Sequence, residues 1–255
     1  MAEFEIKDGV ALIPEGTTMI EEGAFSECTS LVDITIPESV TEIGRCAFFC
    51  CTSLKSITIP TLVTKIGEAA FVGCSSLESI VVAEGNPMYD SREGCNAIIE
   101  TKTNTLRYAC KSTIIPESVT KVGGHAFCGC TSLESVTIPK SVTELGGFAF
   151  CNCRLLESIT IPESVTKIGN SAFKGCRSLK SITIPESVME IDSLAFLGCS
   201  SLKCVTFLSR TKLGNDVFSY SSRRIINVPS DCVDYYKEVL PEEFHDKIVE
   251  LEPKK

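Results

Sequence analysis

Hydrophobic and polar residues recur along this chain with a period of 23 residues. The repeat is clearest in residues 178–199, SLKSITIPESVMEIDSLAFLGC, and variants of this segment fill most of the sequence. The period is marked by prolines, at Pro14, Pro37, Pro60, Pro116, Pro139, Pro162 and Pro185. A fixed period of this size predicts a solenoid, in which each repeat forms one turn and buries its apolar side chains against its neighbours.

Each repeat contains two short predicted strands and a corner. The first strand follows the pattern Leu-x-x-Ile-x-Ile-Pro, so period-2 alternation sends the isoleucines inward and the intervening residues outward. The second strand is Val-Thr-x-Ile-Gly, as in residues 40–44 and 165–169, where glycine permits a sharp change of direction. For the closing Ala-Phe-x-x-Cys segment we predict a single helical or 3₁₀ turn. Its phenylalanines are expected to stack into an aromatic spine, formed by Phe25, Phe48, Phe71, Phe127, Phe150, Phe173 and Phe196.

The period breaks once, in the middle of the chain. Ala83 occupies the proline position, and the next proline of the repeat, Pro116, comes 33 residues later. The intervening stretch lacks Ala-Phe-x-x-Cys, and residues 95–100 and 106–110 have the character of two strands around a polar turn. The sequence therefore predicts a β-hairpin inserted into the solenoid.

Both ends of the chain depart from the repeat, as a solenoid requires when its terminal turns must cover the core. We divide the single predicted domain, residues 1–255, at the points where the repeat changes. The parts are an N-terminal cap and first turn (1–25), repeats (26–85), the irregular repeat with the hairpin (86–115), repeats (116–207), and a degenerate repeat with a C-terminal cap (208–255). In this last part Ser230 is expected to be a helix N-cap and Pro241 to end that helix.

The repeat IPESVTKIGNSAFKGCRSLKSIT resembles the BspA-like subclass of bacterial leucine-rich repeat proteins, which also occurs in some protozoa. NPMYDSREGCNAIIETKTNTL resembles the recurrent hairpin insert of that family, and VPSDCVDYYKEVL resembles its usual terminal turn. The resemblance implies a right-handed superhelix with a parallel β-sheet on its concave face, here of about ten turns. It also implies protein recognition, often adhesion at a cell surface.

Composition excludes several functional classes. The net charge of −9 and the pI near 4.9 argue against a nucleic-acid partner, which requires a basic surface. No apolar run approaches the roughly 18 residues of a membrane-spanning helix, so membrane insertion is not expected. The N-terminus has no basic segment followed by an apolar one, which favours a cytoplasmic protein. The alternative that the resemblance suggests is a cell-surface or secreted protein. We expect a monomer.

Charges also follow the repeat. Five residues after the proline position the sign mostly alternates between neighbouring turns, in the series Glu42, Lys65, Lys121, Glu144, Lys167 and Glu190. Cross-strand pairs of opposite charge support stacking of turns by about 0.2–1 kcal/mol each.

The 15 cysteines follow the repeat as well. Seven of them lie three residues after a spine phenylalanine, which indicates a column of reduced, buried thiols that act as small hydrophobic residues. Neighbouring turns also place His125 and Cys128 of HAFCGC near Cys151, in a group that includes Cys130 and Cys153. Such a group offers an alternative function as a zinc site or a Cys–His enzyme. No Cys-x-x-Cys pair occurs, and we expect no enzyme activity, metal or cofactor.

The outward positions of the first strands carry small hydroxyl side chains. They are Thr35, Ser56, Thr58, Ser79, Ser135, Thr137, Ser158, Thr160, Ser181 and Thr183. This flat surface has two interpretations, a solubilising ladder of good strand formers or a contact face for a protein partner. The hairpin offers a second contact through Tyr89, Arg92, Arg107 and Tyr108, since Tyr and Arg are enriched at binding hot spots.

The leading functional prediction is a non-enzymatic scaffold that binds a protein partner through the concave sheet. The second is a surface adhesin for host or matrix proteins. The third is the metal or Cys–His chemistry of the group around His125.

Overall fold

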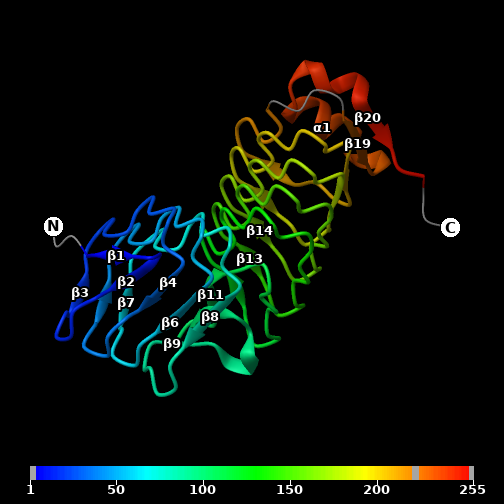
Figure 1. Ribbon diagram of the computed structural model, residues 1–255. Helices are drawn as coiled ribbons and strands as arrows, with labels where there is room; N and C mark the ends of the chain where they lie inside the picture. The colour runs from blue at the N-terminus through cyan, green and yellow to red at the C-terminus, as the bar shows by residue number, and fades with distance from the viewer. Residues whose placement is uncertain (1–3, 220–223, 253–255) are drawn as a thin grey trace.

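The computed structural model describes residues 4–219 and 224–252. Figure 1 shows one continuous stack of turns that leads from the N-terminus to a helical cap around α1 (Val233–Val239) and changes direction near β8, β9 and β11. The stack is a solenoid of about ten turns with parallel strands and little helix, as the repeat predicts. Parts of the two predicted caps and of the degenerate repeat, residues 1–3, 220–223 and 253–255, lie outside the described residues.

The first strand of the repeat forms one side of the solenoid. Its strands are β2 (Val10–Leu12), β4 (Asp33–Thr35), β6 (Ser56–Ile59), β8 (Ser79–Val82), β15 (Ser181–Ile184), β17 (Cys204–Phe207) and β19 (Ile225–Val228). Burial alternates along them, and neighbouring strands pair in parallel, for example Ile182 with Val205. The N-terminal β1 (Ile6–Lys7) pairs antiparallel with β2.

This side is not one continuous sheet, which corrects the prediction of a sheet along the whole face. Residues 135–138 and 158–161 fit the strand pattern, but the structure assigns no strand to either segment. The turns stay stacked because the other two sides of the solenoid hold them, so the first-strand side opens here without separating the turns.

The second strand of the repeat is only two residues long in each turn. These strands are β3 (Met19–Ile20), β5 (Glu42–Ile43), β7 (Lys65–Ile66), β12 (Lys121–Val122), β13 (Glu144–Leu145), β14 (Lys167–Ile168), β16 (Glu190–Ile191) and β18 (Lys212–Leu213). The glycine after the strand allows the backbones of successive turns to approach closely. A Cβ atom on Gly169 would lie 2.6 Å from the backbone nitrogen of Gly147, so this position accepts only glycine without a shift.

The Ala-Phe-x-x-Cys segments, called the corners below, are not helical. Each contains a turn closed by a hydrogen bond across three residues, such as Cys153 N–H to the carbonyl of Phe150 at 3.2 Å. The residues two before and two after Phe150, Phe148 and Asn152, have φ of 57° and 59°, and left-handed residues interrupt a helix. This geometry turns the N–H groups of Phe148, Phe150 and Asn152 toward carbonyls of the next corner, at 2.7–2.8 Å.

The core confirms the predicted aromatic spine. Ring centroids of successive phenylalanines lie 5.0–5.3 Å apart, both from Phe25 to Phe71 and from Phe127 to Phe196. Between the two halves stands Tyr108, edge-on to Phe71 at 5.2 Å. The buried hydrophobic residues accordingly form two clusters, and both include residues of the insert.

All 15 cysteines are reduced thiols, and six of the seven column cysteines are buried. The column has a bonding role that the sequence does not reveal. The Cys153 thiol donates to the carbonyl of Phe127 at 3.2 Å, and Cys176 donates to Phe150 at 3.1 Å, each one turn back. A buried thiol is therefore both a small apolar group and a weak hydrogen-bond donor to the previous corner.

The insert contains the predicted hairpin, formed by β10 (Ala97–Glu100) and β11 (Thr105–Ala109). β9 (Tyr89–Asp90) pairs antiparallel with β10, and β11 pairs in parallel with β12 of the next regular turn. A 3₁₀ helix, η1 (Arg92–Gly94), links β9 to β10. The hairpin is therefore built into the second-strand side of the solenoid and does not project from it.

The C-terminal cap consists of η2 (Ser230–Cys232), α1, η3 (Glu242–Lys247) and β20 (Ile248–Glu250), the last of which pairs in parallel with β19. Pro241 follows α1, as expected. Ser230 is not the N-cap of that helix. It begins the 3₁₀ turn, and the N-cap of α1 is Cys232, without a side-chain hydrogen bond.

A charged side chain occupies the core beside this cap. The pairing of Cys204 with Ile225 places Arg224 opposite the exposed Lys203 of the previous turn. Arg224 is 1% exposed, and its three guanidinium nitrogens have no hydrogen-bond partner among the described residues. Its guanidinium carbon lies 4.8 Å from the ring centroid of Phe218, and burial lowers its pKa to about 10.

Replacing Phe150 with alanine is expected to destabilise the protein by about 3–5 kcal/mol, since it empties a fully buried aromatic site in the spine. Urea unfolding followed by circular dichroism measures the change. The exposed Leu155→Ala is the control and should stay within about 0.5 kcal/mol. A loss of stability below about 1 kcal/mol for Phe150→Ala would show that the aromatic spine contributes little to the stability of the fold.

Arg224→Leu is expected to raise the free energy of unfolding by about 1–2 kcal/mol, because it removes buried donors that have no hydrogen-bond partner among the described residues and leaves an apolar side chain in the core. The exposed Arg210 is the matched control, since its guanidinium donates to the carbonyl of Asp231 at 2.9 Å. Arg210→Leu should be neutral or slightly destabilising in the same unfolding measurement. Destabilisation by Arg224→Leu would mean that the guanidinium supports the cap.

Candidate functional site: the hydroxyl face

The predicted hydroxyl side chains lie on the outer surface of the first-strand side, which we call the hydroxyl face. Nine of the ten are exposed, and the tenth, Ser79, is half-buried. Where strands pair, the hydroxyls stand in register one turn apart, as Ser56 does opposite Ser79 and Thr183 opposite Thr206. Val81, opposite Thr58 and 43% exposed, interrupts the array with an apolar side chain.

The structure brings two of these residues together in one cavity. Thr137 and Thr160 line a hollow of about 640 Å³ between the two turns whose first-strand segments are not paired. Apolar side chains, Val136, Ile138 and Ile161, form part of its wall. The polar groups at its border are Lys140, Glu163 and Ser164.

Among the described residues, the backbone beside this cavity takes part in no strand pairing. The segments 135–138 and 158–161 keep an extended, alternating pattern of burial but form no ladder with each other among the described residues. A partner strand can use such backbone groups for hydrogen bonds, while neighbouring pockets select its side chains. The hydroxyl face therefore combines a rigid surface with a cavity that lies beside main-chain groups outside the strand pairing.

The structure corrects the prediction for the two tyrosines of the hairpin, because both are buried. Tyr89 is 7% and Tyr108 4% exposed. The Tyr89 hydroxyl accepts from Ile66 N–H at 3.2 Å, and the Tyr108 hydroxyl accepts from Ala70 N–H at 3.3 Å and donates to the carbonyl of Gly67 at 2.5 Å. These hydroxyls replace the backbone partners that a regular turn would supply, and burial raises the pKa of Tyr108 to about 12.

The two arginines of the hairpin differ from each other. Arg92 forms two hydrogen bonds with the Asp90 carboxylate, at 2.5 and 2.8 Å, and its Nη1 donates to Asn104 at 2.9 Å. It thus fastens η1 to the hairpin turn, and the hydrogen bonds to Asp90 raise its pKa. Arg107 is half-buried and stays a predicted contact residue.

The side chains around His125 do not converge on one point. Cys130 and Cys153 lie in the buried column and donate to the carbonyls of Ala109 and Phe127. His125 stacks on Phe148 with ring centroids 5.0 Å apart. Within residues 4–219 and 224–252, no three His, Cys, Asp or Glu side chains are placed to hold a metal ion.

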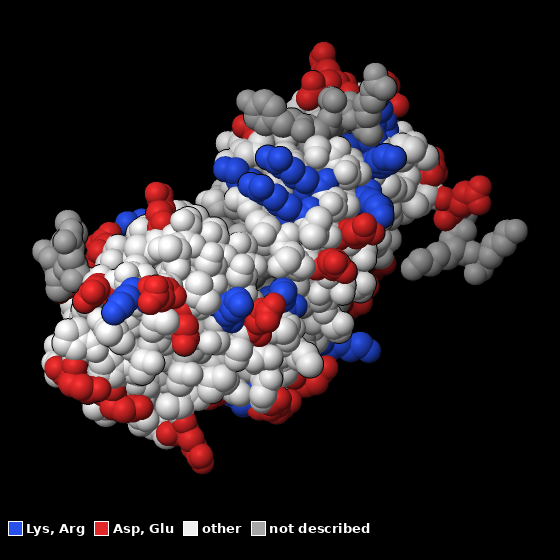
Figure 2. Space-filling model, viewed as in Figure 1, with Lys and Arg blue, Asp and Glu red and all other residues white. Residues whose placement is uncertain are grey.

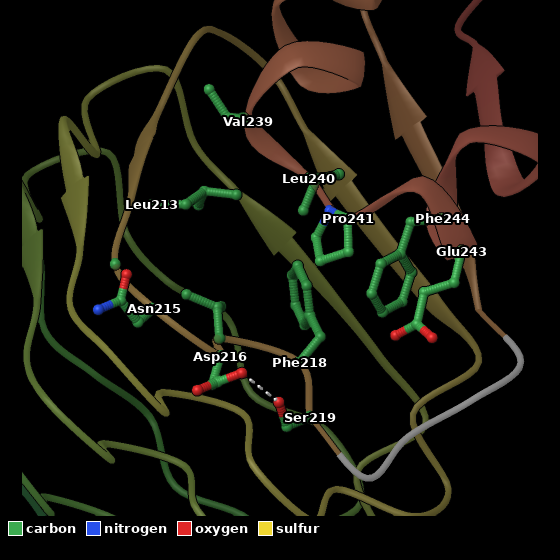
Figure 3. A pocket seen from close by; sticks show the side chains of 12 residues that line it. Leu213, Asn215, Asp216, Phe218, Ser219, Val239, Leu240, Pro241, Glu243 and Phe244 are labelled. Carbon is green, nitrogen blue, oxygen red and sulfur yellow. Dashed lines mark hydrogen bonds between the residues drawn. The ribbon is translucent and has the colours of Figure 1, made fainter.

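Two further hollows lie away from the hydroxyl face. One, of about 600 Å³, follows the corners where the two halves of the solenoid meet and is lined in part by Phe49, His125 and Phe148. The other, of about 410 Å³, separates the last corner from the C-terminal cap (Figure 3). Asp216 and Glu243 line this second hollow, and Asp216 accepts a hydrogen bond from Ser219 at 2.9 Å.

The fold and the exposed strand face define a repeat scaffold of the leucine-rich type. The profile described as "BspA type Leucine rich repeat region" matches residues 10–96 and 97–224, with six copies. The chain belongs to this BspA-type leucine-rich repeat family.

Solved structures agree with this assignment. A leucine rich cell surface protein from Faecalibacterium prausnitzii is 38% identical over 76% of this chain, with a TM-score of 0.66. This chain spans only 52% of that protein. The pneumococcal vaccine antigen PcpA (21% identity, 92% of this chain, 66% of that one, TM-score 0.72) and a leucine-rich repeat protein from Eubacterium ventriosum (22%, 87%, 66%, 0.56) share the fold. A comparison with curated proteins found no match.

Within the part of the chain that the structure describes, no helix has the length and apolar character needed to cross a membrane.

Tyr108→Phe is expected to destabilise the protein by about 1–3 kcal/mol, because it leaves two buried backbone groups unpaired while keeping the ring. Thermal and urea unfolding measure the loss. Tyr235→Phe is the control, since the half-buried Tyr235 hydroxyl makes one bond, to the carbonyl of Thr211. If Tyr108→Phe loses no more stability than Tyr235→Phe, the Tyr108 hydroxyl does not hold the two halves of the solenoid together.

Proposed function

We propose that this protein is a non-enzymatic scaffold that binds a protein partner through the hydroxyl face. The observation that carries the proposal is the pairing of exposed hydroxyls with a cavity between unpaired strand segments, at Thr137 and Thr160. Side chains on this face point away from the core, so they are free to serve binding. The stacked turns are rigid, and a rigid surface loses little conformational entropy when it binds.

A surface role is the second proposal and concerns where the scaffold works. It is supported by the 38% identity to a protein described as a leucine rich cell surface protein. In this surface role the partner is a host or matrix protein, and the chain acts as an adhesin. The alternative is a cytoplasmic role, in which the protein binds an intracellular protein. In both, the chain is expected to be a monomer that binds no nucleic acid.

The triple variant Thr137→Lys, Thr160→Lys and Thr183→Lys tests the face. Three long cations on adjacent turns obstruct a flat contact and are expected to weaken binding of a partner recovered by affinity capture at least about tenfold. Titration by surface plasmon resonance gives the dissociation constant.

The matched control is Thr120→Lys, Thr143→Lys and Thr166→Lys. These threonines are also exposed and lie in one column on consecutive turns, where each bonds a backbone carbonyl one turn back. The control should bind normally. Retained binding by the first variant, with an unchanged circular dichroism spectrum, would place the contact elsewhere. Separate captures from matrix extracts and from cell lysate distinguish the adhesin from the intracellular scaffold.

A further inference from the structure

The corner side of the solenoid carries a groove that the hydroxyl face does not include. We call the hollow lined by Phe49, Val72, His125, Cys128 and Phe148, with Asn152 and Arg154 at its end, the corner groove. Phe49, His125 and Phe148 are half-buried, so their rings are partly open to solvent. Stacked rings of His125 and Phe148 form an apolar wall, and burial lowers the pKa of His125, which favours its neutral form.

The insert explains why this groove exists. On the second-strand side, β9, β10 and β11 come between β7 and β12. On the corner side the regular turns meet directly, since Gly73 N–H bonds the carbonyl of Cys128 at 3.2 Å. A Cβ atom on Gly129 would lie 2.6 Å from the Cα of Gly73. The stack therefore bends toward its corners here, and the groove lies on the inner side of the bend.

A basic surface continues from the end of the groove. We call Arg154, Lys174, Arg177, Lys180 and Lys203 the basic patch. Asn152, at the end of the groove, donates its N–H to the carbonyl of Lys174 at 2.7 Å, and Ser178 N–H bonds the carbonyl of Arg154 at 3.2 Å. Lys203 N–H bonds the carbonyl of Lys180 at 2.9 Å. The patch thus occupies three adjacent turns, and all of its members except the half-buried Lys174 are exposed.

The patch lacks the alternation of charge found along the second strands. There, Lys121 pairs with Glu144 at 2.9 Å and Lys167 with Glu190 at 3.1 Å. In the patch, Arg177 follows Arg154 and Lys203 follows Lys180 in the same column, one repeat apart. Like charges on adjacent turns oppose stacking.

Few acidic side chains balance these cations. Among the described residues, only Lys180 of the patch forms an ion pair, with Glu157 at 2.6 Å. Figure 2 shows Lys and Arg side chains gathered on the C-terminal half of the face in view, while basic and acidic side chains alternate over the N-terminal half. A local cationic surface attracts an anionic partner, even on a chain whose net charge is −9.

We propose that the corner groove and the basic patch together bind an acidic peptide segment of a protein partner, with one large apolar side chain in the groove and carboxylates on the patch. The aromatic wall argues for an apolar anchor. The adjoining cations, of which only Lys180 has an ion-pair partner among the described residues, argue for acidic residues next to that anchor in the sequence. The proposal concerns a different surface from the hydroxyl face, so each is tested by variants that leave the other intact.

Fluorescence anisotropy with two labelled probes tests the proposal. The first probe is a short peptide of Glu and Ser with one Phe near its end, and the second has Ser in place of that Phe. We expect the Phe probe to bind about tenfold more tightly than the Ser probe, and its binding to weaken as salt is raised. Arg177→Glu with Lys203→Glu should weaken both probes about tenfold or more.

Two further variants separate the groove from the charge. Phe148→Ser should weaken only the Phe probe, and Ser171 occupies the equivalent left-handed position one turn on, so serine fits the backbone there. Lys55→Glu with Lys102→Glu makes the same change of net charge on exposed residues outside the patch and should leave both probes unaffected. Circular dichroism verifies that each variant is folded.

Two outcomes would overturn the proposal. If neither probe binds, the patch does not recognise acidic peptides. If the two probes bind equally and Phe148→Ser changes nothing, the surface recognises negative charge without an apolar anchor. Heparin, added as a competitor, then displaces both probes to the same extent, which assigns the patch to polyanions in general.

Discussion

Every part of this structure depends on the hydrogen bonds that join each turn to the next. They run along all three sides of the solenoid, through the parallel strands of two sides and through the backbone of the corners. A repeat of 23 residues places equivalent groups one turn apart, so any side chain that suits one turn meets its own copy in the next. The aromatic spine, the column of thiols and the alternating ion pairs are three consequences of that single constraint.

The same constraint decides what could be predicted from the sequence. Positions that recur at a fixed period share one structural environment, so most strands and the spine around Phe150 could be predicted from the pattern. The break in the period predicted the hairpin within residues 86–115. The pattern says nothing about backbone dihedral angles. The left-handed residues that flank each corner phenylalanine, and with them the absence of a helical turn, became evident only in the structure. His125 and Phe148 occupy such positions without any signal in their residue type.

Single residues outside the repeat were the hardest to interpret. Tyr108 has the composition of a binding hot spot, yet its hydroxyl completes the backbone bonds between Ala70 and Gly67 where the regular stack is interrupted. Arg224 has the residue type of a surface position, yet its side chain is buried at 1% exposure. In both cases the side chain is buried because the neighbouring turn departs from the repeat. The sequence pattern of a single turn does not show which residues of the next turn will cover it. The exposed hydroxyls were predictable because strand alternation alone decides their direction.

Departures from the repeat are also where this scaffold acquires distinct surfaces. A perfect solenoid presents the same groups at every turn and offers a partner no fixed register. The cavity between residues 135–138 and 158–161 gives the hydroxyl face a position that differs from its paired turns, and the bend at the insert gives the corner side another. Both stand beside intact ladders, which hold the turns together while one side departs from regular pairing. Stability and recognition therefore use different sides of the same turns, so substitutions at one surface need not weaken the stack.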